Sequence, residues 1–126
     1  MFRLHRKGSS ATEAVEYIVA GATIGLGTLL KYDNGKLVIA SGSEVPEYVS
    51  LGTAKLNEIC PVKRILEDEV YETTLSADGA SLKLGQKVTV DVGGDKVTAT
   101  VASGIFEIVE MLGTGVGSKV RGLFRR

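Results

Sequence analysis

The side chains that most often carry chemistry are scarce in this chain of 126 residues. It holds one histidine, His5, and one cysteine, Cys60, whereas a typical structural zinc site needs about four such ligands. One cysteine also has no partner for a disulfide within the chain. Ser9 and Ser10 lie near His5, but a segment without regular pattern cannot hold a nucleophile and a base in fixed geometry. We therefore predict no catalysis, no metal and no cofactor.

The acidic run Glu67-Asp68-Glu69, with Glu72 nearby, is the remaining candidate for a chemical site. Hard divalent cations take oxygen ligands, but the spacing is not that of an EF-hand loop. We interpret the run as a solvated loop that faces a basic partner, and an enzyme that uses only carboxylates is the most distant alternative. Cys60 is expected to be a small buried apolar residue.

Two glycine-rich segments resemble phosphate-binding loops only superficially. They are Gly25-Leu26-Gly27 and the run from Gly113 to Gly117. Neither has the G-x-G-x-x-G spacing between a strand and a helix, and neither is followed by Gly-Lys-Ser or Gly-Lys-Thr. Their glycines are expected to form turns between strands.

The sequence pattern between these residues is that of short β-strands. Asn34-Gly35 lies between two β-prone runs and predicts a hairpin, because both residues tolerate positive φ. A helix remains an alternative for residues 105–112. Strands are expected at residues 14–20, 28–32, 36–40, 61–66, 70–75, 105–112 and 119–124, with an edge strand between Pro46 and Gly52.

The clearest alternation surrounds Gly93-Gly94. Apolar and polar residues alternate on both sides of this pair, which predicts a hairpin with one buried face. The residues expected in the core are Val88, Val90, Val92, Val97, Ala99 and Val101.

Short strands with glycine-rich turns predict an all-β fold, a small β-barrel or β-sandwich. Residues 1–12 show no sustained periodicity and are expected to form an extended basic N-terminal arm. Residues 13–126 are expected to form a single β domain.

The net charge is zero, but charge is unevenly distributed. Residues 1–8 carry three basic residues and residues 119–126 carry four, with no acid in either segment. Residues 9–118 carry eight basic and fifteen acidic residues, a balance of −7. Basic ends on an acidic body suggest a partner with an acidic surface.

Three other classes of protein fit less well. The uncharged run Tyr17–Leu30 is too short for a membrane span, which needs about 20 residues. Lys7-Gly8 followed by Glu13 resembles a pilin-type cleavage site, but the long apolar helix of a pilin does not follow. Nucleic-acid binding is the main alternative among small barrels, although the seven aromatic residues are scattered.

The segment VAGATIGLGTLLKYDNGKLVIASG, together with Val49–Ala54, resembles the small β-rich capsid decoration, or cement, proteins of tailed phages. The resemblance is best over residues 14–54 and looser over residues 60–124. It implies a non-enzymatic protein of the virion that docks on the major capsid protein at the outer surface of the capsid. It also implies a homo-oligomer, with a trimer favoured.

On this interpretation the two basic ends contact the capsid. Basic side chains would meet acidic groups of the shell, and two apolar side chains would enter pockets beside them. An arm could also add a strand to a sheet edge of the partner. The predicted capsid-binding residues are Phe2, Arg3, Leu4, Arg6, Lys7, Arg121, Arg125 and Arg126.

Overall fold

The computed structural model of the chain describes residues 1–6 and 15–125. Over these residues every regular element is a strand, so the predicted all-β class is confirmed. The strands are β1 (Arg3–Arg6), β2 (Val15–Val19), β3 (Leu29–Asp33), β4 (Lys36–Ile39), β5 (Tyr48–Ser50), β6 (Ile59–Arg64), β7 (Val70–Thr74), β8 (Lys87–Val88), β9 (Phe106–Met111) and β10 (Lys119–Phe124).

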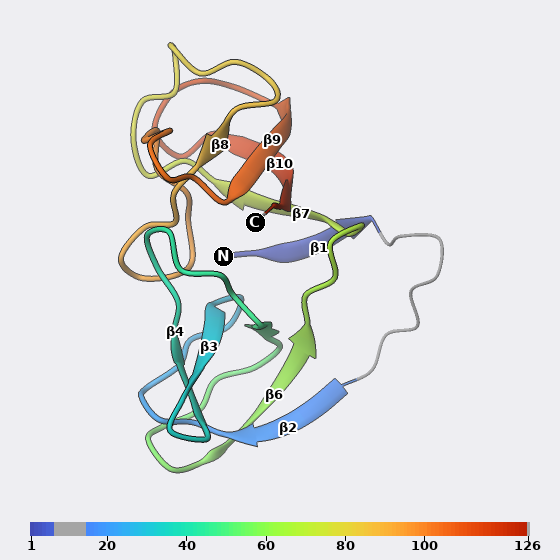
Figure 1. Ribbon diagram of the computed structural model, residues 1–126, viewed down its shortest axis with the longest axis vertical. Coiled ribbons are helices and arrows are strands. Elements are labelled where there is room, and N and C mark those ends of the chain that lie inside the picture. The colour runs from blue at the N-terminus through green and yellow to red at the C-terminus, as the bar shows by residue number, and fades with distance from the viewer. Residues whose placement is uncertain (7–14, 126) are drawn as a thin grey trace.

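The strands form two antiparallel sheets that lie one above the other along the long axis (Figure 1). The first sheet has the order β1-β7-β10-β9-β8, and the second has the order β2-β6-β5-β3-β4. The N-terminal strand β1 therefore belongs to the sheet that also contains the C-terminal strand β10. The chain crosses from the second sheet to the first between β6 and β7.

The second sheet is built around one long antiparallel pairing. Val19 pairs with Ile59, Ile24 bridges Ala54, and Leu29 pairs with Val49. Five residues separate successive pairs on both sides, so the register does not slip across the loops that join the strands. The sheet also curls, because the Gly21 amide just after β2 donates to the Leu37 carbonyl of β4 at 2.7 Å.

The buried apolar residues form two clusters. The curl of the second sheet encloses one cluster, which includes Ile24, Leu30, Tyr48, Cys60 and Val62. Cys60 is thus buried, as predicted. The larger cluster lies between the sheets and combines residues of the first sheet with a few that belong to, or follow, strands of the second. Its members are Phe2, Leu29, Ala40, Val49, Tyr71, Leu75, Val88, Val90, Val97, Ile105, Phe106, Ile108, Val120 and Phe124.

The hairpin predicted at Asn34-Gly35 is confirmed. Asn34 has φ of 52° and Gly35 has φ of 80°, so both adopt the left-handed conformation that such a turn requires. Asp33 pairs with Lys36 on either side of them. The turn therefore fixes the register of β3 and β4.

The valine hairpin is present, but its core face is only partly as predicted. Val90 bridges Val97, and Val88 is buried with them. Val92 is 83% exposed and Val101 is also exposed, while Ala99 is only partly buried. The prediction is wrong for these positions. Val92 lies within the turn that begins at Asp91, whose amide donates to the Lys96 carbonyl, and Val101 lies beyond Thr100, whose carbonyl accepts from the Thr89 amide.

One further prediction is wrong, and an alternative left open by the sequence is decided. The strand between Pro46 and Gly52 is not an edge strand, because β5 lies between β6 and β3 and its three residues are buried. Residues 106–111 form strand β9, which excludes the helix considered for that segment. The side chains of Phe106 and Ile108 supply its buried face.

The described part of the predicted N-terminal arm is built into the first sheet. Strand β1 pairs with β7, placing Arg3 opposite Glu72 and Leu4 opposite Tyr71. Phe2 is 2% exposed, and its ring centroid lies 5.7 Å from that of Phe106. The prediction of a separate arm is thus wrong for residues 1–6. With only two apolar side chains, this segment has too little alternation for its sequence to indicate a strand. Residues 7–12 lie outside the described residues.

The acidic run is not wholly a solvated loop. Glu67 and Asp68 are not buried, but Glu69 is fully buried. Its two carboxylate oxygens accept hydrogen bonds from the Lys63 ammonium at 2.6 and 2.7 Å, and one also accepts from the Tyr71 hydroxyl at 3.1 Å. The prediction of a surface run is therefore wrong for Glu69, which joins β6 of the second sheet to β7 of the first.

Val90→Asp and Val92→Asp test which valines of the hairpin are buried and which are exposed. Val90→Asp should lower the free energy of unfolding by about 3 kcal/mol or more, because it buries a charge without a partner. Val92→Asp should change it by less than about 0.5 kcal/mol. Urea unfolding of both variants measures the difference, and equal effects would show that the register is wrong.

Phe2→Ala tests whether the N-terminal strand is part of the core. Truncation of a buried phenylalanine typically costs about 3–5 kcal/mol, so a large loss of stability is expected. Arg6→Ala on the same strand is the control, because Arg6 is exposed. If thermal unfolding showed equal stability for the two variants, residue 2 would not contribute to the core.

Candidate partner-binding surface

Basic residues from the two ends of the chain meet on the outer face of the first sheet. Strands β1 and β10 lie on either side of β7, so residues more than a hundred positions apart become neighbours. Arg3 and Arg121 both pair with Glu72, one from each side. We call this surface the basic face; it comprises Arg3, His5, Arg6, Lys119 and Arg121.

An ion-pair row crosses the basic face over four strands. An Arg3 guanidinium nitrogen lies 3.6 Å from one Glu72 carboxylate oxygen, and Arg121 Nε lies 2.9 Å from the other. Arg121 also pairs with Glu110 of β9. The hydrogen bond from Arg121 lowers the pKa of Glu72, and nearby Lys119 and Arg3 act in the same direction. Alternating charges on directly opposed residues favour sheet pairing, so the row holds β1 in the sheet.

A hollow lies on each side of this row. The larger one, of about 300 Å³, is lined by His5, Arg6, Val70, Val109, Glu110 and Arg121. The smaller one, of about 140 Å³, is lined by Met1, Arg3, Glu72, Thr73, Thr74 and Lys119. The larger hollow is lined mainly by polar groups and suits acidic side chains of a partner, whereas the smaller one combines Arg3 and Lys119 with a largely apolar wall.

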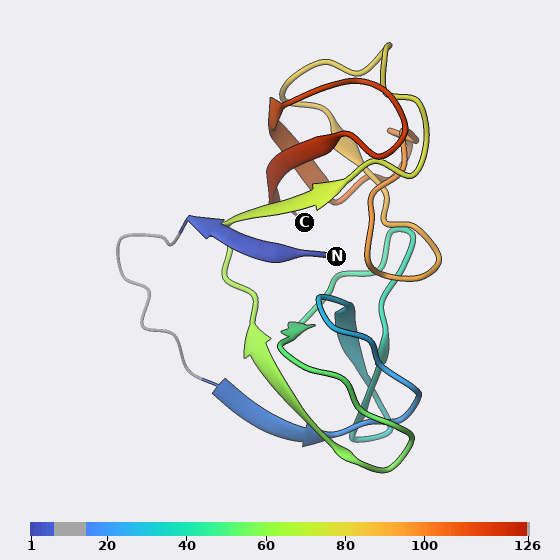
Figure 2. The same ribbon diagram turned by 180° about the vertical axis from the view of Figure 1, so that it is seen from behind.

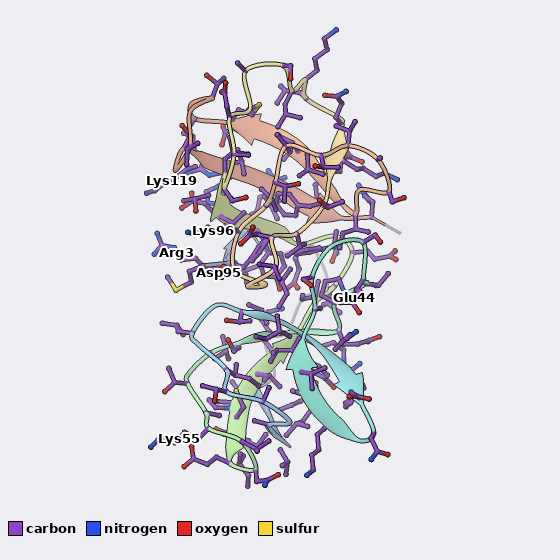
Figure 3. The ribbon with its side chains drawn as sticks, turned by 90° about the vertical axis from the view of Figure 1, so that its left-hand side faces the viewer. Arg3, Glu44, Lys55, Asp95, Lys96 and Lys119 are labelled. Atoms are coloured by element: carbon purple, nitrogen blue, oxygen red, sulfur yellow. The ribbon has the colours of Figure 1, made fainter. Side chains whose placement is uncertain are left out.

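Figure 3 shows Arg3, Lys96 and Lys119 on one side of the molecule. Burial lowers the pKa of the Met1 amino group, and the charges of Lys96 and Arg3 lower it further, whereas Asp95 raises it. Positive charge therefore continues along this edge at Lys96, next to the acidic Asp95. The side chain of Arg3 is 61% exposed, so it can reach a partner despite its contact with Glu72.

The structure brings together only some of the predicted capsid-binding residues. Arg3, Arg6 and Arg121 share the basic face. Phe2 and Leu4 do not belong to it, because Phe2 is buried and Leu4 packs against the central core. They cannot enter pockets of a partner without leaving their own fold.

Three other predicted residues lie apart from the basic face or outside the described residues. Arg125 Nε lies 3.5 Å from a Glu107 carboxylate oxygen just beyond the end of β10. Lys7 and Arg126 lie outside the described residues. Of the predicted residues, the structure thus groups the arginines of the paired strands on one surface.

His5, Lys119 and Lys96 belong to this surface or its edge but were not among the predicted residues. The spacing of two between Lys119 and Arg121 is the spacing of one strand face, and that signal was available in the sequence. On β1 the register shifts between Leu4 and Arg6, so alternation alone does not place His5 and Arg6. The position of Lys96 depends on how the valine hairpin folds back, which the sequence pattern did not reveal.

A second polar cluster joins four strands of the second sheet and has a structural role. Arg64 donates to the Tyr48 hydroxyl, which lies 3.0 Å from a Glu16 carboxylate oxygen and 2.9 Å from the Tyr32 hydroxyl. Burial raises the pKa of Tyr48, and the hydrogen bonds to Tyr32 and Glu16 add to this. Tyr48 therefore stays protonated as a hydrogen-bonding group rather than serving as a base.

Over residues 1–6 and 15–125, no three His, Cys, Asp or Glu side chains are grouped so that they could hold a metal ion. Within the same described ranges, no helix has the length and apolar character needed to cross a membrane.

Glu72→Gln should destabilise the protein in a pH-dependent way. A folded pKa below the ordinary value of 4.5 means that this carboxylate stabilises the fold above that pH. The contribution is lost as pH falls through the folded pKa, so wild type and variant should converge in acid. A difference of about 1 kcal/mol is expected at pH 7.

Urea unfolding at a series of pH values measures this difference. Glu110→Gln is the matched control, since it removes a carboxylate at the end of the row whose side chain is 50% exposed, and its effect should be smaller. If the free energy of unfolding of Glu72→Gln differed from that of wild type by the same amount at every pH, the stabilising role assigned to the Glu72 charge would be contradicted.

No protein-family model and no curated protein matches this chain. Among solved structures, it is similar to the N base of head fiber gp8.5 of bacteriophage phi29. The TM-score is 0.66, the sequences are 17% identical, and the match covers 90% of this chain and 94% of the other. At this identity the likeness shows a shared fold, which extends over nearly the whole of both chains.

Proposed function

We propose that this protein is a non-enzymatic structural protein of a phage head. The observation that carries the proposal is the likeness in fold to the head fiber N base, which covers 90% of this chain. The sequence resemblance to capsid decoration proteins points to the same class independently. A rigid body of two packed sheets and a polar binding face suit a protein that acts by attachment.

Within this role, the partner is the major capsid protein and the site of action is the outer surface of the capsid. The basic face supports this proposal, because its arginines and its larger hollow could receive acidic side chains of a shell. Bidentate pairing with carboxylates favours arginine at such contacts. A trimer is the favoured oligomer. Repetition over many lattice sites would turn modest contacts into strong retention.

Binding of single-stranded nucleic acid is less well supported. That function uses aromatic side chains beside the basic groups, on which bases stack. The exposed aromatic residues of the described chain are Tyr17 and Tyr32, and both belong to the second sheet. The aromatic residues of the first sheet, including Tyr71 and Phe106, are buried. The basic face thus offers charge without stacking surfaces.

Addition of the purified protein to phage shells that lack it tests the proposal. The wild-type protein should co-sediment with shells, and occupancy should fall as salt rises, because charged contacts are screened over about 8 Å at physiological ionic strength. Arg6→Glu should lower the affinity by about tenfold or more, since it replaces an attraction by a repulsion at the interface.

Lys83→Glu is the matched control, because it makes the same change of charge in the loop before β8, away from the basic face. It should bind shells like wild type. Failure of the wild-type protein to bind any shell would refute the docking role. Equal binding by Arg6→Glu and wild type would place the docking surface elsewhere.

A further inference from the structure

The outer face of the second sheet is covered over only part of its area. Lys63 and Val49 lie opposite each other on this face, Val49 pairs with Leu29, and all three are covered where the first sheet packs against them. The face continues along β6 and β2, where Tyr17 pairs with Pro61 and Val19 pairs with Ile59. Here no element of the described chain lies above it: Tyr17 is 69% exposed and Ile59 is 62% exposed.

The uncovered part extends from these strands into an apolar groove. The Leu51 amide donates to the Pro61 carbonyl at 2.9 Å, which places the loop after β5 beside β6. Leu51 and Leu26 then line a groove of about 210 Å³ together with Met1 and Leu4. We call this surface the bare apolar face; it comprises Val15, Tyr17, Leu26, Leu51, Ile59 and Pro61.

Figure 2 shows the strands that carry this surface, with β2 and β6 side by side in the lower part of the molecule and the N-terminus between the two sheets. The first sheet and its basic face lie in the upper part. The bare apolar face and the basic face therefore lie on different sheets, and they adjoin at Met1 and Arg3, which line both the groove and the smaller hollow.

The charges around the bare apolar face indicate what kind of partner it fits. Glu16 of β2 points to the opposite side of the sheet, where it bonds to Tyr48. The Lys63 ammonium is turned inward to Glu69. Arg3 also lines the groove, but the exposed side chains of the second sheet on this face are apolar, unlike those of the basic face. Interfaces between copies of one chain are more apolar than other interfaces and poor in charged residues.

Two further features favour a second copy of the chain as the occupant. The chain has a net charge of zero, so two copies do not repel each other as a whole. Strand β2 is an edge strand that pairs with β6 without a bulge, and only its far end, at Ala20 and Gly21, meets β4. Along Val15–Val19 one side of its backbone therefore has no strand partner among the described residues, and a strand of a second copy could pair there.

From these observations we infer that the bare apolar face is the interface through which copies of this chain associate with one another. The inference rests on the proposed function in one respect: the bare apolar face would be the contact that holds together the oligomer proposed for the phage-head protein. The two surfaces then have different roles, since apolar contacts of the second sheet hold the copies together while the basic face meets the shell.

Sedimentation velocity of the full chain, without shells, tests this interface. The wild-type protein should self-associate within concentrations up to about 100 μM, since interfaces of ordinary size give micromolar or tighter binding. Tyr17→Lys and Ile59→Lys should each raise the dissociation constant by about tenfold or more, because each places a charge at the centre of the contact. Both side chains are exposed in the single chain, so the variants should stay folded, with the circular dichroism spectrum of wild type.

Leu84→Lys is the matched control, because Leu84 is 63% exposed in the loop before β8, outside the bare apolar face. It should associate like wild type. A wild-type protein that remains monomeric, or folded Tyr17→Lys and Ile59→Lys variants that associate like wild type, would overturn the inference. Monomeric protein that still binds shells would refute the interface alone, whereas association without shell binding would refute the proposed function alone.

Discussion

The buried ion pair between Lys63 and Glu69 determines how the two sheets meet. Lys63 lies on β6 of the second sheet and Glu69 immediately precedes β7 of the first, so the pair spans the crossing of the chain between these strands. A charge left alone in this interior would be strongly destabilising, because neither group could recover its hydration. The Leu66 amide and the Tyr71 hydroxyl also donate hydrogen bonds to the Glu69 carboxylate. The two sheets are therefore held in the one arrangement in which both charges are paired.

This arrangement gives the two sheets different surfaces. The first sheet uses its inner face, with Tyr71, Phe106 and Phe124, to cover part of the second sheet, and its outer face is left polar. The second sheet curls over its own cluster, so its outer face must be covered from outside. The first sheet reaches only the part near Leu29, Val49 and Lys63. The way the two sheets pack thus leaves an uncovered apolar surface on the second sheet and a charged outer surface on the first. These two surfaces suit different kinds of contact.

The row of Arg3, Glu72 and Arg121 shows how strand order creates a site from distant segments. The unequal distribution of charge in the sequence indicated that the two ends were basic and would meet an acidic partner. It could not indicate that β7 lies between β1 and β10, because strand order depends on which edges pair after the chain has folded. The same pairing buried Phe2, which was expected on the surface because a short alternating segment at a chain end carries too little periodic signal.

Local pattern alone determined the all-β class, the hairpin at Asn34-Gly35 and the last strand at Lys119–Phe124. These features depend on turn residues and on alternation within a few positions, so they are encoded where they occur. Tertiary structure decided the burial of Glu69, the exposure of Val92, the central position of β5 and the bare apolar face. Each depends on what lies opposite a residue in space. A residue's own neighbours in the chain set which way its side chain points, but only the packing of the other sheet decides whether that side is covered.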